Sequence, residues 1–164
     1  MSDQLNFAEG GKPTLPSALN VLTILTIIGS ALAIIGAFWT FATVDSSYEK
    51  MRDAQATMAE APAFVKSMMG PEMLESMRKQ KENKIPVLVI TLLGAGLCLF
   101  GAIEMRKLKK QGYILWLVGE ILPIIATGLF VGFGMMFKGF ALIFMSIPII
   151  FLILYTVNKK HLTN

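Results

Sequence analysis

The sequence YILWLVGEILPIIATGLFVGFGMMF, residues 113–137, decides the fold of this chain. Its side chains are almost all apolar, and it is longer than the roughly 20 residues that a helix needs to cross the hydrocarbon core of a bilayer. One carboxylic acid, Glu120, lies inside it. An acid at the centre of a membrane helix costs about 2.5–3.5 kcal/mol on insertion scales, so its presence needs a reason. The stretch therefore predicts a transmembrane span and marks Glu120 as a candidate site.

The composition agrees with a membrane protein. Of the 164 residues, 54% are hydrophobic, which exceeds what a soluble domain of this size requires. The net charge of +4 comes from basic residues that gather at the ends of apolar runs, where they indicate topology rather than nucleic-acid binding. A single cysteine and a single histidine provide no catalytic set and no metal-ligand cluster. We predict no enzymatic activity, no cofactor, no metal and no nucleic-acid partner.

Three further apolar runs complete the predicted architecture, an all-α polytopic membrane protein with an antiparallel four-helix transmembrane bundle. The segment between the first two runs is polar and carries a helical apolar stripe, which is typical of an amphipathic outer loop. The predicted segments are an N-terminal tail (1–17), a first span (18–43), the outer loop (44–84), a second span (85–105), a basic turn (106–112), a third span (113–137), a fourth span (138–157) and a C-terminal tail (158–164).

Charge sets the predicted orientation. Arg106, Lys107, Lys109 and Lys110 lie within the short turn between the second and third spans. Dense positive charge in a short loop is typical of the cytoplasmic side, so we expect both termini in the cytoplasm and the long loop outside. Glu104, at the end of the second span, is expected to form a solvated ion pair with the neighbouring basic residues.

The outer loop is predicted to contain short amphipathic helices. Ser46 and Glu49 fit a capping box, which predicts a helix start, and Pro62 suits the first turn of a second helix. Glu75 and Lys79 form an i,i+4 pair on a third. Methionines gather here, and thioethers could bind a soft metal such as Cu(I), but we interpret them as adaptable apolar contacts. The residues predicted to contact a partner are Phe64, Met68, Met69, Met73 and Met77.

Small residues at four-residue spacing are expected to let helices approach closely in the membrane. Two such series and one GxxxG motif occur in the first, second and third spans. The predicted packing residues are Gly29, Ala33, Ala37, Gly94, Cys98, Ala102, Gly128 and Gly132.

Glu120 shares one helical face with Tyr113 and Thr127, because the three recur every seven residues. Pro123 lacks an N–H, so the carbonyl of Gly119 loses its helical partner beside the carboxyl group. This pattern predicts an oxygen-rich pocket that could hold a proton, a water or a cation. Counting residues along the spans brings three further polar side chains to a similar depth, namely Thr23, Thr26 and Cys98.

Three roles for Glu120 remain open at this stage. It could be the coupling acid of a small proton- or cation-linked transporter or channel. It could be protonated, hydrogen-bond to Thr26 or a buried water, and only specify how the helices pack. It could also meet a basic group on another protein. Our leading hypothesis is an accessory or assembly subunit of a larger membrane complex, with membrane lipid and other membrane proteins, or a second copy, as partners.

One resemblance adds to this interpretation. The run 105–113, MRKLKKQGY, together with 119–123, GEILP, resembles uncharacterised four-span bacterial membrane proteins over spans two to four. The resemblance implies a multi-pass protein of the bacterial inner membrane and implies no activity.

Overall fold

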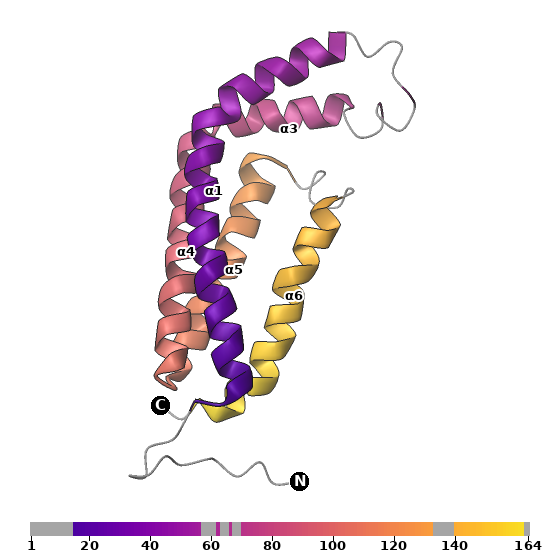
Figure 1. Cartoon of the computed structure of the whole chain (residues 1–164). Helices are drawn as coiled ribbons and strands as arrows, with labels where there is room; N and C mark the ends of the chain where they lie inside the picture. The colour runs from indigo at the N-terminus through magenta and orange to yellow at the C-terminus, as the bar shows by residue number, and fades with distance from the viewer. Residues whose placement is uncertain (1–14, 57–61, 63–65, 67–69, 133–139, 163–164) are drawn as a thin grey trace, which may run out of the picture.

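All regular secondary structure in the described part of the chain is helical (Figure 1). The computed structural model describes residues 15–56, 62, 66, 70–132 and 140–162, with side chains from 146 onward in the last range. Within these residues, three helices, α1, α4 and α5, are long and apolar enough to cross a membrane. The predicted all-α class and membrane-compatible character are confirmed at this level. The helices are α1 (Ser17–Ala56), α3 (Pro71–Glu82), α4 (Lys84–Arg106), α5 (Lys110–Phe130), α6 (Phe140–Asn158) and the 3-10 helix η3 (Lys159–His161).

Helix α4 packs against both α1 and α5, and α6 joins them at one end (Figure 1). The start of α1, the α4–α5 turn and η3 all lie at this end, which we call the basic end because it carries the lysines of the turn and of η3. At the opposite end, the last turns of α1 bend away from the bundle and run beside α3.

Glycines bring the backbones of α4 and α5 into contact. A Cβ placed on Gly101 would lie 2.6 Å from the Gly112 carbonyl oxygen, and one on Gly119 would lie 2.7 Å from the Gly94 carbonyl oxygen. Real Cβ atoms do not approach so closely, so only glycine fits at these positions. Small residues promote membrane-helix association because they allow this approach. The predicted residues Gly94, Cys98 and Ala102 are buried in the same helix.

The hydrophobic core lies at the basic end, where four helices meet. Its largest side chains are Trp116 of α5 and Tyr155 of α6, each 1% exposed, with ring centroids 4.6 Å apart. Leu19 and Leu22 of α1 and Met105 of α4 complete the contact. Further from this end, α6 exposes isoleucines at 147, 149 and 150. Helix α6 is therefore fixed to the bundle by its last turns.

The predicted helix start at Ser46 is wrong, because α1 continues without a break from Ser17 to Ala56. Residues 44–56 contain no glycine or proline, and extending an existing helix costs less than nucleating a new one. The Ser46 hydroxyl accordingly donates to the Thr43 carbonyl oxygen at 3.0 Å within the helix.

Helix α3 confirms the third predicted loop helix, and its Glu75 and Lys79 form the expected i,i+4 ion pair at 3.4 Å. Phe64, Met68 and Met69 lie outside the described residues.

Two of the predicted small-residue features do not form close contacts between the described helices of this chain. Gly29 and Ala33 are exposed, and a Cβ at Gly29 would meet no other atom within 4 Å. The buried residues of α1 are instead Leu19, Leu22, Thr23, Thr26 and Ser30, together with Val44 further along. Gly128 is buried, but Gly132 has a φ of +110° and lies beyond the end of α5. Its N–H donates to the Thr127 carbonyl oxygen at 3.0 Å, so this glycine ends the helix.

Helix ends also differ from the predicted span bounds. The second span, predicted as 85–105, agrees with α4 to one residue at each end. The third, predicted to run to residue 137, ends as a helix at Phe130, because the backbone of Gly132 is not helical. The basic turn is reduced to residues 107–109, since α5 already begins at Lys110.

Candidate functional site

Glu120 lies on α5 at the edge of the contact with α4. The preceding residue, Gly119, is buried against the α4 backbone, and Glu120 is partly buried beside it. Its carboxyl group lies close enough to the thiol of Cys98 to interact with it. The thiol itself donates to the Trp116 carbonyl oxygen at 3.6 Å. The acid is therefore held by α4 within the hydrophobic part of the bundle.

A polar cluster forms around this position, with one residue from each of four helices: Thr26, Cys98, Glu120 and Tyr155. The hydroxyl groups of Thr26 and Tyr155 share a buried hydrogen bond of 2.7 Å. Glu120 and Cys98 lie close enough to Tyr155 to interact with it electrostatically. The predicted common depth of Thr26, Cys98 and Glu120 agrees with this arrangement. Residue counting did not find Tyr155, because counting locates a Cα atom and a tyrosine side chain reaches beyond one helical turn.

The other residues predicted around Glu120 do not assemble with it. The Tyr113 hydroxyl interacts with that of Thr156 at 3.0 Å, near the end of α6. The Thr127 hydroxyl donates to the Pro123 carbonyl oxygen at 2.8 Å. Since residues seven apart lie about 10 Å from each other along a helix, the predicted stripe meets different neighbours along α5.

The Gly119 carbonyl oxygen was predicted to belong to the oxygen-rich pocket around Glu120, and this prediction is wrong. A Cβ on Gly94 would lie 2.8 Å from the Gly119 carbonyl oxygen, so this carbonyl faces the α4 backbone rather than the Glu120 carboxyl group. Thr23 was predicted at the same depth. Its hydroxyl donates to the Leu19 carbonyl oxygen at 2.9 Å and accepts a hydrogen bond from the Arg106 guanidinium at 3.3 Å. Thr23 is therefore part of the basic end.

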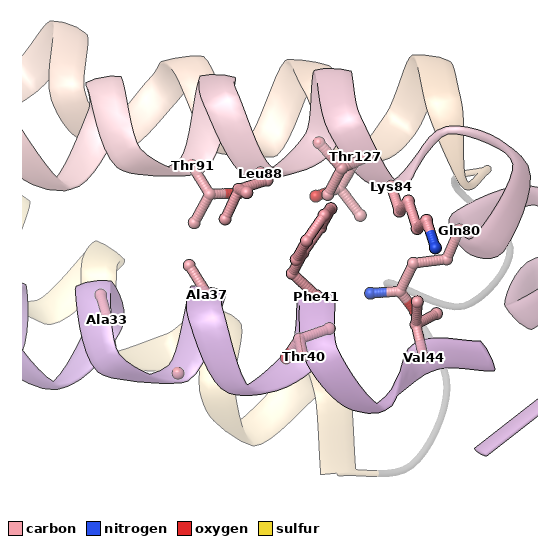
Figure 2. Close-up of a pocket in the computed structure, with 12 residues that line it drawn as sticks. Ala33, Ala37, Thr40, Phe41, Val44, Gln80, Lys84, Leu88, Thr91 and Thr127 are labelled. Atoms are coloured by element: carbon pink, nitrogen blue, oxygen red, sulfur yellow. The ribbon is translucent and has the colours of Figure 1, made fainter. Parts of the chain in front are cut away.

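A groove of about 320 Å³ separates α1 from α4 in the half of the bundle away from the basic end (Figure 2). Helix α1 contributes a small-residue wall, and the Phe41 ring reaches across toward α4. The sequence had indicated Ala33 and Ala37 as packing residues, and both line this groove. The groove is lined by Ala33, Gly36, Ala37, Thr40, Phe41 and Val44 of α1, Gln80 of α3, Lys84, Val87, Leu88 and Thr91 of α4, and Thr127 of α5.

An ion pair closes the groove near α3. The Lys84 ammonium lies 2.6 Å from the Asp45 carboxylate and 5.5 Å from the centroid of the Phe41 ring. Lys81 lies 3.8 Å from the same carboxylate. Asp45 follows the apolar part of α1, and its hydrogen bond with Lys84 lowers the pKa of the Asp45 carboxyl group. This pair joins the extension of α1 to α3 and α4.

Glu104 forms an ion pair with a neighbouring lysine, as expected. The expected exposure of this pair to solvent is wrong, because Glu104 is buried. Only 8% of its side chain is exposed. Its carboxylate forms ion pairs with the ammonium groups of Lys107 at 2.8 Å and Lys109 at 2.6 Å. Between these lysines, Leu108 adopts a φ of +60° and packs into the core. Arg106 turns to α1 and donates to the Asn20 side chain at 2.8 Å. Glu104 therefore holds the sharp turn between α4 and α5.

No protein-family model matches the chain, and the searches of curated proteins and of solved structures also found no match. The described geometry defines an all-helical class with three helices able to span a membrane, a tight α4–α5 pair, an internal polar cluster and an open groove on α1.

Proposed function

We propose that this chain is a non-enzymatic, four-span protein of the bacterial inner membrane that binds a transmembrane helix of another membrane protein as an accessory or assembly subunit. Helix α6 is the fourth span in this proposal. Its nineteen residues, Phe140–Asn158, extend about 28 Å at 1.5 Å per residue and carry no charged side chain. The basic end faces the cytoplasm, because short loops rich in lysine and arginine remain on that side.

The observation that carries the proposal is the uncovered small-residue wall of α1. A Cβ added to Gly36 would meet no other atom within 4 Å, and Ala33 beside it is exposed. Lipid tails are as apolar as these side chains, so helices associate in bilayers by close packing and not by the hydrophobic effect. A wall of small residues beside a groove supports such packing, since an incoming helix can place a large side chain in the groove.

Residues of helix α3 also support the binding of a partner at the groove on α1. Gln80 of α3 lines the groove, and the partly buried Met73 and Met77 lie on the same helix. Methionine side chains adapt to irregular surfaces. The proposed partner therefore contacts α3 above the membrane and α1 within it.

Photo-crosslinking in native membranes tests the interaction. A benzoylphenylalanine at Gly36 should capture a discrete protein, whereas the same group at Ile35, which is exposed and does not line the groove, should not. Gly36→Leu should abolish co-purification of that protein from mild detergent, and Gly36→Ala should retain it. Crosslinks that join two copies of this chain would identify self-association. Recovery of an uncrosslinked monomer at both positions would contradict the proposal.

The polar cluster favours a second candidate, a small proton- or cation-coupled transporter or channel that uses Glu120. The supporting observation is that a partly buried acid is surrounded by a thiol, a tyrosine and a threonine from three other helices. This candidate requires that Glu120→Gln abolish proton or cation flux in vesicles while the protein remains folded. If the substitution changes only stability, Glu120 has a structural role.

A further inference from the structure

A second cavity, of about 470 Å³, lies at the basic end between the start of α5 and η3. Six described residues line it, and three of them are lysines from two separate segments while none is an acid. The lining residues are Lys110, Tyr113, Ile114, Lys159, Lys160 and Leu162.

The geometry positions Lys159 at this cavity. Leu162 is 3% exposed and belongs to the hydrophobic core, so it anchors η3 to the bundle. The Lys159 ammonium lies 5.7 Å from the centroid of the Tyr113 ring, and the Tyr113 hydroxyl is held by Thr156. Cation–π contact of this kind positions an ammonium group without neutralising it. The cavity therefore presents organised positive charge.

The lysines of the α4–α5 turn are separate from those of this cavity. The adjacent lysines, Lys107 and Lys109, are both paired with Glu104 and do not line the cavity. Lys110 and Lys159 come from different segments and converge on the same space. Converging ammonium groups suit a phosphate group, which carries several acceptor oxygens and negative charge.

An apolar stripe continues from the cavity along α5. Ile114 lies one turn beyond Lys110, and Val118, Ile121 and Ile125 follow on the same side of the helix, all exposed. An amphiphile with an anionic head and an acyl chain matches a cationic cavity that opens onto such a stripe. A free phosphate would use only the lysines and would leave the stripe uncovered.

We infer that the cavity at the basic end binds the phosphate headgroup of an anionic glycerophospholipid, whose acyl chain lies along Ile114 and Val118. The inference rests on the membrane insertion in the proposed function and is independent of the groove on α1. Basic cavities on the cytoplasmic side of transmembrane helices are suited to acidic headgroups.

Native mass spectrometry of the full-length chain in detergent micelles tests the inference, with phosphatidylglycerol and phosphatidylcholine as probes. We expect one phosphatidylglycerol retained per chain, in preference to phosphatidylcholine. Each lysine near an anionic lipid contributes about fivefold in affinity, so Lys110→Gln/Lys159→Gln should weaken phosphatidylglycerol binding by about 30-fold. The charge-matched control Lys50→Gln/Arg52→Gln, at the far end of α1, should leave binding unchanged.

A double variant that keeps both positive charges tests whether a loss of binding is caused by misfolding. Lys110→Arg/Lys159→Arg keeps the charge and should retain binding, and circular dichroism should give equal helicity for all variants. Equal retention of the two lipids, or an equal loss of binding in the control, would overturn the inference. A third arm adds glycerol 3-phosphate without lipid, and binding as tight as that of phosphatidylglycerol would identify a soluble phosphate site and overturn the lipid assignment. A negative result here, with a protein captured at Gly36, would leave the proposed partner function intact.

Discussion

The backbone contact between α4 and α5 predicts that Gly101 tolerates no side chain. In Gly101→Ala, the new Cβ would lie 2.6 Å from both the Gly112 carbonyl oxygen and the Trp116 nitrogen. Ordinary contact begins near 3.4 Å, so the helices must separate by about 0.8 Å at this point. A gap of 0.5–1 Å forfeits about a quarter to a half of the dispersion energy along the contact.

The magnitude follows from a matched variant in the same helix. A Cβ at Gly96 of α4 would meet no other atom within 4 Å, so Gly96→Ala brings only the higher helix propensity of alanine. Both variants share this gain of about 1 kcal/mol, and their difference isolates the clash. Overpacking of this kind costs about 1–3 kcal/mol, so Gly101→Ala should be less stable than Gly96→Ala by that amount.

The assay is unfolding in mixed micelles, followed by the loss of helical circular dichroism as the fraction of denaturing detergent rises. A double variant sharpens the test, because Gly101 and Gly112 touch each other and a second Cβ costs less once the helices have separated. Gly101→Ala/Gly112→Ala should therefore lose less stability than the sum of the single variants. Equal stability of Gly101→Ala and Gly96→Ala would refute the described α4–α5 contact.

Three further predictions concern the polar contacts. Glu104→Gln should destabilise the chain by about 1–3 kcal/mol in the same assay, because a buried charged acceptor of two lysines is lost. Tyr155→Phe removes the buried hydrogen bond with Thr26 and should cost about 0.6–1.5 kcal/mol. Asp45 has a lowered pKa in the folded chain, so its ion pair with Lys84 stabilises above the ordinary aspartate pKa of about 3.9 and is lost as the pH falls through the lower folded value. Spin labels on α1 and α3 should separate over that acidic range.

Each of these predictions has a matched control. Glu82→Gln affects an exposed ion pair at 3.8 Å and should change stability by less than about 0.5 kcal/mol. Tyr113→Phe removes an exposed hydrogen bond and should cost less than Tyr155→Phe. Asp53→Asn alters an exposed pair and should not move α3, whereas Asp45→Asn should reproduce the acidic separation at neutral pH. Equal effects in a variant and its control would contradict the corresponding contact.

Hydropathy predicted the bounds of a helix well where charge bounds an apolar run. Lys84 and Arg106 flank such a run, and α4 has these residues as its ends. The end of α1 was missed because hydropathy locates the membrane boundary, whereas the helix continues through polar residues up to Ala56.

The α4–α5 contact was only partly visible in the sequence. The four-residue series indicated Gly94, but the contacts also use Gly101, Gly112 and Gly119. Gly94 and Gly101 are seven residues apart, as are Gly112 and Gly119, and antiparallel helices with equal spacing place these glycines opposite each other. This signal was present in the sequence, and a search restricted to four-residue spacing does not find it.

The sequence predicted the depth of the candidate-site residues along their helices, but it did not predict their hydrogen-bond partners. Counting along the spans placed Thr26 and Cys98 near Glu120, since rise per residue is nearly constant in helices. Hydrogen-bond partners depend on how each helix is rotated, which residue counting does not give. Thr26 therefore bonds to Tyr155, and the Cys98 thiol beside Glu120 donates to the Trp116 carbonyl oxygen.

The three-residue turn after α4 has a consequence for how the chain assembles during synthesis. Helices α4 and α5 are consecutive, so their contact closes a short loop at low entropic cost and can form as soon as α5 has been made. The bond between Thr26 and Tyr155 joins residues 129 positions apart and has to wait for the last helix. We therefore expect a nascent chain arrested before α6 to contain the glycine contacts between α4 and α5 already.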